Sequence, residues 1–146
     1  MTVGAFCTRQ VDLADPHEAV RVAADRMRQR NVGTLVVLDA EKRPLGIITD
    51  RDLVTRVLAE DRDPLGTLVR DVMTEVPRTI EESASLSTAL HLMSIGTFRR
   101  IPVVDDEGRL VGLIGLDDVL HLLAEEMTEV GKLLEREGPR AAARVR

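Results

Sequence analysis

The chain has 146 residues, of which 44% are hydrophobic and 31% are charged, and its formal net charge is −5. This length suits one compact domain or two small repeats. The negative charge argues against a nucleic-acid-binding surface, and so does the presence of only two aromatic residues, Phe6 and Phe98. We therefore expect no nucleic acid among the partners of this protein.

The cysteines, the histidines and the apolar runs argue against disulfide-linked, metal-binding and membrane proteins. Cys7 is the only cysteine, so an intrachain disulfide cannot form. His17, His91 and His121 are isolated and lack the spacing of metal ligands, so we expect no metal site. The longest aliphatic runs have strand length and no charged-then-apolar leader precedes them, so we expect a cytoplasmic protein without a membrane partner.

The first predicted elements are a short strand at 10–13 and a helix. Asp15 is the expected N-cap of this helix, Pro16 its first residue, and Glu18 the acidic member of a capping box. The sequence at 31–33 ends the helix. The elements that follow in this half are strands at 34–39 and 45–49, a helix at about 50–60, a linker at 61–66 and a helical turn at 67–73.

The second half is expected to repeat this order. Its predicted elements are a strand at 76–80, a helix at 83–95, hairpin strands at 100–104 and 110–114, and a long helix from 116 to about 135. The pair Gly138-Pro139 is expected to break the long helix, which leaves residues 138–146 as a basic, flexible tail.

An internal repeat explains why the halves share one order. Residues 35–53 align without a gap over residues 101–119, at a constant offset of 66 positions. Seven of the 19 aligned positions are identical, whereas unrelated sequences would share about one. These identities are Val37/Val103, Asp39/Asp105, Glu41/Glu107, Arg43/Arg109, Gly46/Gly112, Ile48/Ile114 and Asp52/Asp118.

The repeat predicts how the chain is organised. A repeat of about 60 residues is too small to bury a stable core alone. We therefore expect an α+β fold in which two β-α-β-β-α repeats, at 1–66 and 67–137, pack through their sheets about a pseudo-twofold axis. Such packing opens a cleft at the seam, and the cleft can hold two related pockets.

The same pattern recurs where a strand meets a helix in each copy. Gly, two aliphatic residues, three variable residues and Asp occupy 46–52 and again 112–118. Together with the sequences at 99–105 and 71–74, these stretches resemble a tandem pair of cystathionine-β-synthase (CBS) domains, and the resemblance covers about residues 6–123. A CBS pair implies a regulatory, non-enzymatic module that binds an adenosine compound in its cleft.

The resemblance assigns roles to particular residues. The aspartate that ends the pattern, Asp52 or Asp118, is expected to accept hydrogen bonds from both ribose hydroxyls. Thr49 lies where the family places a phosphate-binding hydroxyl, at the start of a helix. Gly115 departs from this pattern, because it supplies no hydroxyl to the Asp118 pocket. The remaining expected ligand contacts are Arg99 and Arg100 at the phosphates and Ile47, Ile48, Thr79, Ile80 and Pro102 around the adenosine.

These assignments compete with structural ones. Thr49 and Asp52 also match a capping box with Asp in place of Glu, so helix capping alone could account for both residues. Arg99 and Arg100 could be a solvated pair at a strand edge. Arg99 and Arg100 have only Gly33 and Thr34 as counterparts in the first copy, so the two sites are chemically unequal. We expect one better adenosine site around Thr49 and Asp52, with Arg99 and Arg100 reaching its phosphates across the seam.

Three functions are compatible with these features. The favoured one is a sensor that binds AMP, ADP, ATP, S-adenosylmethionine or NAD and signals in trans to a protein target. A structural adaptor whose ligand pocket has decayed is the alternative. An enzyme is disfavoured, because no nucleophile–base pair, metal cluster or Walker loop is recognisable. Surplus apolar residues on the second helix of each copy predict a homodimer.

Overall fold

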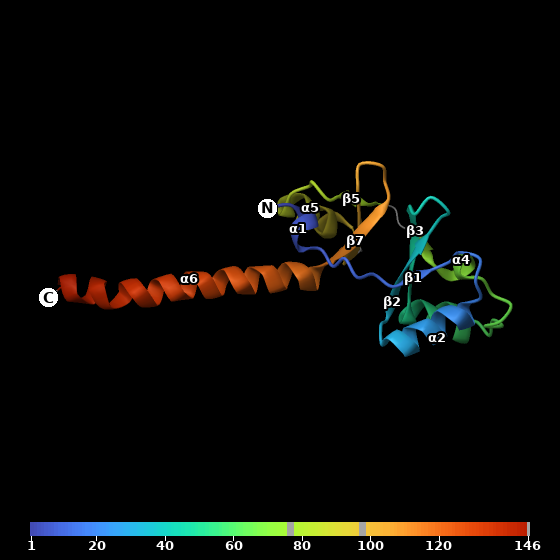
Figure 1. The fold of residues 1–146 in the computed structure, drawn as a ribbon. Coiled ribbons are helices and arrows are strands. Elements are labelled where there is room, and N and C mark those ends of the chain that lie inside the picture. Colours follow the sequence, from blue (N-terminus) through green and yellow to red (C-terminus); the bar gives the residue numbers. More distant parts are fainter. Residues whose placement is uncertain (76–77, 97–98, 146) are drawn as a thin grey trace.

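The computed structural model describes residues 1–75, 78–96 and 99–145, with side chains described as far as residue 137. The chain forms two lobes, and a long helix projects from the second (Figure 1). The elements are α1 (Val3–Phe6), β1 (Leu13–Ala14), α2 (Val20–Arg30), β2 (Thr34–Leu38), β3 (Pro44–Thr49), α3 (Asp50–Leu53), the π-helix η1 (Val54–Leu58), α4 (Val69–Val72), β4 (Thr74–Glu75), β5 (Ile80–Glu81), α5 (Leu86–Ile95), β6 (Arg100–Val104), β7 (Leu110–Gly115) and α6 (Leu116–Val145).

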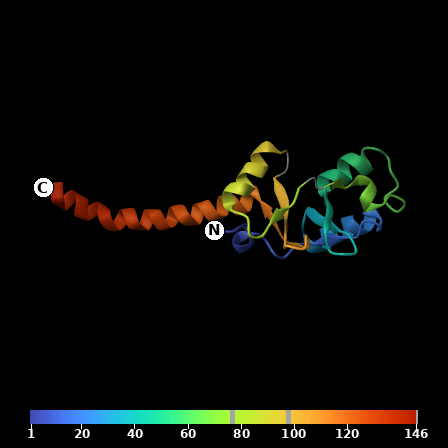
Figure 2. The ribbon, with the colours of Figure 1, turned by 90° about the horizontal axis from the view of Figure 1, so that it is seen from above.

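Each lobe is built on a small mixed sheet. The first sheet has the strand order β1-β2-β3-β4 and the second β5-β6-β7. In both sheets the first two strands are parallel, and the second and third strands are antiparallel. Both antiparallel pairings have a register shift at the same place, after the fourth residue pair. The two lobes lie side by side with their strands toward the junction (Figure 2). The predicted α+β class and its two repeats are confirmed.

The leading segment of each repeat crosses to the sheet of the other repeat. Thr74 lies in the leading segment of the second repeat but pairs with Ile47 of β3. Thr8 lies in the leading segment of the first repeat but forms an antiparallel bridge with Leu113 of β7. The two pairings are related by the offset of 66. The same exchange holds for the short helices, because Val69 of α4 lies in the core of the first lobe and Val3 of α1 in that of the second.

The two lobes have equivalent cores. Ala23, Leu35 and Ile48 are fully buried in the first lobe, and the residues 66 positions later fill the same places in the second. Equal spacing within the chain therefore corresponds to equal packing. The shared glycines have a steric role, because a Cβ at Gly112 would lie 2.6 Å from the carbonyl oxygen of Thr8, and one at Gly46 would lie 2.7 Å from that of Thr74.

The faces of the two sheets that turn away from these cores meet at the junction. Val36 and its counterpart Pro102 belong to neither core, yet both are fully buried. At the hairpin tips the backbone N–H of Leu110 donates to the carbonyl oxygen of Lys42 over 2.9 Å. Nearby, Nε of Arg43 donates to the Glu107 carbonyl over 3.2 Å. The sheets thus pack against each other, as the repeat predicts.

The predicted N-terminus of the first helix is wrong. Helix α2 begins at Val20, because the backbone N–H of Val20 donates to Thr67 O at 2.9 Å and that of Arg21 to Pro64 O at 3.0 Å. The linker therefore satisfies amide groups that were assigned to a side-chain cap. Asp15 and Glu18 instead close a turn, in which Glu18 accepts a hydrogen bond from the backbone N–H of Asp15 at 3.2 Å.

Other predicted boundaries also differ from those observed. The first strand lies at Leu13–Ala14, the helix predicted at 50–60 changes to a π-helix after Leu53, and α5 begins at Leu86 with Ser85 as its N-cap. Of the strand predicted at 76–80, β5 contains Ile80, while residues 76–77 lie outside the described residues. Helix α6 also continues through Gly138-Pro139 to Val145, so the predicted break is wrong. The alanines at 141–143 have high helix propensity and offer no turn.

The exchanged segments yield a stability prediction. Gly112→Ala should lower the free energy of unfolding by about 1–3 kcal/mol, because the added methyl group displaces the backbone at Thr8. Gly131→Ala is the matched control, since nothing lies within 4 Å of its Cβ position, and it should leave stability unchanged or raise it by up to about 1 kcal/mol. Urea denaturation measures both, and equal stability of the two variants would contradict the exchange.

Candidate functional site

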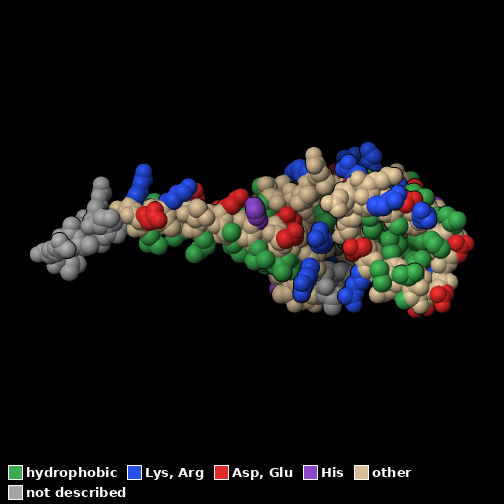
Figure 3. Space-filling model, turned by 90° about the horizontal axis from the view of Figure 1, so that it is seen from below, with side chains coloured by type: hydrophobic (Ala, Val, Ile, Leu, Met, Phe, Trp, Pro, Cys, Tyr) green, Lys and Arg blue, Asp and Glu red, His purple; other side chains and the backbone are tan. Residues whose placement is uncertain are grey.

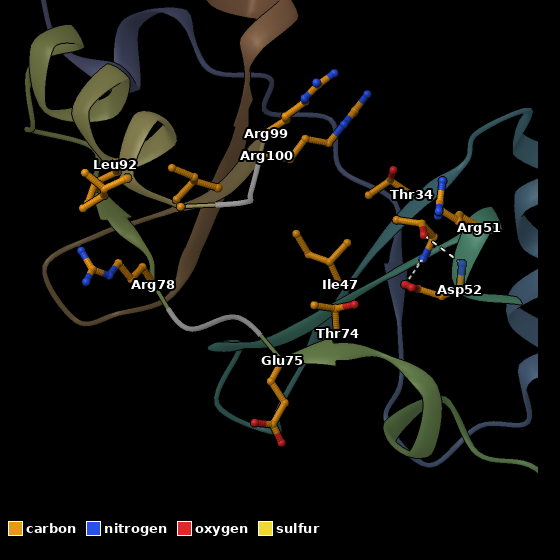
Figure 4. Close-up of a pocket in the computed structure, with 14 residues that line it drawn as sticks. Thr34, Ile47, Arg51, Asp52, Thr74, Glu75, Arg78, Leu92, Arg99 and Arg100 are labelled. Carbon is orange, nitrogen blue, oxygen red and sulfur yellow. Dashed lines mark hydrogen bonds between the residues drawn. The ribbon is translucent and has the colours of Figure 1, made fainter. Parts of the chain in front are cut away.

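A cavity of about 590 Å³ opens between the lobes at the end of β3. This volume lies within the range of small-molecule sites. The first lobe contributes Ile47, Thr49 and Asp52 to its lining, and the second contributes Leu92 and Arg100. Figure 4 shows Ile47 and Asp52 on one side of the seam and Leu92 and Arg100 on the other. The cavity is therefore a property of the pair of repeats and of neither repeat alone.

Thr49 and Asp52 form a reciprocal capping box at the start of α3. Oδ2 of Asp52 accepts a hydrogen bond from the backbone N–H of Thr49 at 3.0 Å, and Oγ1 of Thr49 accepts one from that of Asp52 at 3.2 Å. The capping interpretation is thus confirmed. It leaves room for a ligand, because a carboxylate accepts about four hydrogen bonds and, among the described residues, Oδ1 of Asp52 has only Nε of Arg56 nearby, at 3.8 Å.

Four arginines line the cavity: Arg51, Arg78, Arg99 and Arg100. In the described part of the chain, none of them has a carboxylate oxygen within 4 Å. By contrast, nine other arginines have such a partner: Arg9, Arg21, Arg26, Arg28, Arg30, Arg43, Arg56, Arg70 and Arg109. The carboxylates in the lining are Asp52 and Glu75. An acidic protein thus concentrates uncompensated positive charge in one cleft, which suits an anionic ligand.

The arginines are divided between two ends of the cavity. Figure 4 shows Arg99 and Arg100 reaching from the second lobe toward Thr34 and Arg51, while Arg78 lies on the far side beside Leu92. Between these ends the wall is apolar, with Ile47 from β3 and Leu92 from α5. The cavity therefore combines an apolar middle with a cationic end near the start of α3.

A second cavity, of about 620 Å³, lies beside Asp118. Oδ2 of Asp118 accepts a hydrogen bond from the backbone N–H of Gly115 at 2.7 Å, and Oδ1 accepts one from the hydroxyl of Thr8 at 3.1 Å. Both oxygens of this carboxylate are thus engaged. A side chain at position 115 would collide with Oδ1 of Asp117, so the missing hydroxyl cannot be restored without moving that residue.

The two cavities are joined at their cationic ends. Thr34, Thr49, Arg51 and Arg100 line both of them. The cavities differ in their carboxylates, because Asp52 keeps one oxygen largely free while Asp118 has hydrogen bonds on both. The two carboxylates are therefore unequal in their hydrogen bonding, and which cavity binds a ligand better stays a prediction.

The structure separates the predicted contact residues into two groups. It brings together Ile47, Thr49, Asp52, Arg99 and Arg100 in the first cavity, and it places Asp118 in the second. It does not bring in the other four: Ile48 and Ile80 are buried in the cores, Pro102 is buried between the sheets, and Thr79 is exposed outside both cavities.

For Ile48 and Ile80 the physical reason is the alternation of side chains along a strand, whereas Pro102 lies on the face toward the cleft but is covered by the other sheet. Neighbours such as Ile47 and Ile48 point to opposite faces, so both cannot line one cavity. The same alternation would have predicted Thr34 in the lining of the cavity, because Thr34 on β2 pairs with Thr49 on β3 and directly paired side chains lie on the same face. Arg78 and Leu92 had no comparable signal in the sequence, because they reach the cavity from a loop and from α5.

The chain thus has two pseudo-symmetric repeats with paired pockets at their seam, which is the architecture of a tandem domain module. A model of the CBS domain matches residues 3–59 and 69–125. The two matches are offset by 66 residues, as the repeat is. The protein belongs to the CBS domain family and carries a tandem CBS pair.

Relatives and solved structures agree with this assignment. An uncharacterised protein of Methanopyrus kandleri is 34% identical to this chain. The match covers 84% of this chain and 62% of the length of the relative. The structure of CBSX2 of Arabidopsis thaliana in complex with AMP is 27% identical and superposes with a TM-score of 0.71, covering 86% of this chain and 98% of that one.

A further similar structure contains metal. Hypoxic Response Protein I of Mycobacterium tuberculosis, with two coordinated zinc ions, is 28% identical with a TM-score of 0.73, covering 83% of this chain and 98% of that one. Within the described residues, no three His, Cys, Asp or Glu side chains are grouped to hold a metal ion. Nor does any helix among those residues have the length and hydropathy needed to cross a membrane.

The capping box can be tested by substitution. Thr49→Ala should lower the free energy of unfolding by about 1 kcal/mol, because the backbone N–H of Asp52 loses its acceptor at the start of α3. Thr128→Ala is the control, since that hydroxyl donates to the carbonyl of Ala124 on an exposed helix face, and it should change stability by less than about 0.5 kcal/mol. Chemical denaturation distinguishes the two, and an unchanged stability of Thr49→Ala would show that the cap contributes nothing.

Proposed function

We propose that this protein is a regulatory, non-enzymatic module that binds an adenine nucleotide in the cavity beside Asp52 and signals its presence to a protein partner. The observation that carries this proposal is the grouping of three arginines without carboxylate partners, as far as the chain is described, near a helix start and a carboxylate; they are Arg51, Arg99 and Arg100. The first two features favour a phosphate group, and the third favours a ribose.

Each part of the nucleotide has a matching part of the cavity. Oδ1 of Asp52 accepts from the ribose hydroxyls, while Oδ2 keeps its capping bond. The phosphate lies among Arg51, Arg99 and Arg100, near the amide groups that begin α3. The adenine ring fits the apolar middle between β3 and α5, where no aromatic side chain is required.

The ligand class follows from charge and from one similar structure. CBSX2 contains AMP. The cationic end of this cavity supports a phosphorylated ligand, so AMP, ADP or ATP is favoured over S-adenosylmethionine, and NAD is the other phosphorylated candidate. We propose no resident metal.

Catalysis is not part of the proposal. Among the described residues that line the first cavity, none is a histidine, cysteine or serine that could act as a base or nucleophile. Binding alone can still produce a signal, because a ligand that prefers one arrangement of the two lobes shifts the population toward it.

We further propose that the protein acts in the cytoplasm as a homodimer. Val54 and Leu58 on η1 are 55% and 73% exposed, and their counterpart surface at the start of α6 exposes Leu116 and Leu120. Exposed apolar surface on both equivalent helices favours a second copy as the partner.

A structural adaptor is the second candidate function. It is supported by the Asp118 cavity, in which Gly115 supplies no hydroxyl and both carboxylate oxygens are already hydrogen-bonded. If both cavities were empty in the cell, the module would serve as a scaffold for its partner.

Ligand-dependent melting separates the two candidates. AMP, ADP or ATP at a hundredfold excess over Kd should stabilise the fold by about 2.7 kcal/mol, which is roughly 5–10 °C for a protein of this size. The shift should disappear in Asp52→Ala and persist in Asp118→Ala. Absence of a shift with all three nucleotides, S-adenosylmethionine and NAD would favour the adaptor, and loss in Asp118→Ala alone would reverse the assignment of the better site.

The role of the arginines has a separate test. Arg100→Ala should weaken AMP binding about tenfold, since a hydrogen bond to a charged group contributes roughly 1.5 kcal/mol or more, and it should leave adenosine binding nearly unchanged. Arg62→Ala is the control, because Arg62 likewise has no carboxylate oxygen within 4 Å in the described chain but lies outside both cavities. Calorimetric titration measures the four affinities. An equal loss for AMP and adenosine in Arg100→Ala would show that the arginine does not bind phosphate.

A further inference from the structure

The two cavities are built from equivalent positions of the two repeats. Several residues that line the second lie 66 positions from residues that line the first, with Asp52 and Asp118 as the central pair. The cavities can therefore be compared position by position. The equivalent uncharged pairs are Ile47/Leu113, Thr49/Gly115 and Thr74/Thr8.

This comparison reveals a reversal of charge. As far as the linings are described, the first contains four arginines and two carboxylates, whereas the second contains two arginines and four carboxylates. At the surface, basic side chains lie on both sides of the junction between the lobes, with acidic ones among them (Figure 3). No arginine of the first cavity has a basic counterpart in the second. The four pairs are Arg51/Asp117, Arg78/Asp12, Arg99/Gly33 and Arg100/Thr34.

The second cavity shares both of its arginines with the first. Arg51 and Arg100 line both cavities, and in the proposed function they bind the phosphate of the nucleotide beside Asp52. Once engaged there, they no longer offset the carboxylates of the second lining. A second phosphate would therefore meet an excess of negative charge. The carboxylates that produce this excess are Asp12, Asp50, Asp117 and Asp118.

Among these carboxylates, Asp117 is the one best placed to repel a phosphate. Asp12 is engaged in an ion pair, because its Oδ1 accepts a hydrogen bond from Nε of Arg30 at 2.7 Å. In the part of the chain that the structure describes, no ion pair joins Asp117 to a Lys or Arg. Oδ1 of Asp117 lies against Gly115, in the space that a Cβ would take. The start of α6 thus already has an anion beside it, where the first cavity would place the phosphate.

We infer that Asp117 is a specificity-determining residue, which excludes phosphorylated ligands from the second cavity and limits each chain to one bound nucleotide. The inference rests on the proposed function, because it takes the cavity beside Asp52 as the phosphate site. Adenosine has no phosphate and does not meet this repulsion. The second cavity therefore discriminates against a nucleotide relative to its nucleoside, whereas the first favours the nucleotide.

Calorimetric titration with AMP counts the sites. The native chain should bind one AMP and Asp117→Arg should bind two, because this substitution gives the second cavity the charge that Arg51 gives the first. A hydrogen bond between an arginine and a phosphate should strengthen AMP binding there about tenfold or more and leave adenosine binding unchanged. Asp106→Arg is the control, since it makes the same change of charge at an exposed turn outside both cavities, and it should retain one site.

A neutral substitution separates repulsion from the new contact. Asp117→Asn keeps the shape of the side chain, and loss of the repulsion alone should raise the AMP affinity of the second cavity by up to about fivefold. Because Asp117 is exposed, both substitutions should leave the fold intact, which melting without ligand verifies.

Three results would overturn the inference: two AMP molecules bound per native chain, a single site in Asp117→Arg, or an equal gain for adenosine and AMP. A native chain that binds no AMP would instead refute the proposed function. In that case the gain of one AMP site in Asp117→Arg over the native chain would still support the role of Asp117, and the lack of a gain would refute it.

Discussion

The exchange of leading segments between the repeats is the constraint on which the rest of the structure depends. Thr74 adds to the sheet of the first lobe, and Thr8 to that of the second. Because each segment is covalently joined to the opposite repeat, the two sheets are held face to face at two points related by pseudo-symmetry. Gly46 and Gly112 permit the close backbone approach that this pairing needs. The cleft is the space that remains between sheets held in this way.

The chemistry of the cleft follows from where the strands end. The end of β3 and the start of α3 bring Thr49 and Asp52 to the seam, and the start of β6 brings Arg100 to the same place from the other lobe. The capping box holds the carboxylate in position before any ligand arrives, so capping and binding are compatible roles of one residue. Pseudo-symmetry duplicates the geometry, but single substitutions make the copies unequal, and Gly115 is the clearest of these.

Much of this was accessible from sequence. The gapless offset of 66 predicted the repeats, the facing sheets and the location of Asp52 and Asp118. The exchange was not predicted, because the segments at 1–9 and 67–75 share only Val3/Val69 and Thr8/Thr74. The cap of α2 was misassigned to Asp15 because its real acceptors, Thr67 O and Pro64 O, are distant in sequence. Ile48 and Ile80 were placed at the ligand because the two faces of a strand were not separated, whereas Pro102 is on the correct face but is buried between the sheets.

A crystal structure of the protein grown with AMP tests the central claim most directly. We predict one nucleotide at the seam, with its ribose hydroxyls on the carboxylate of Asp52 and its phosphate among Arg51, Arg99 and Arg100. A nucleotide found elsewhere, with this cavity empty, would contradict the proposed site.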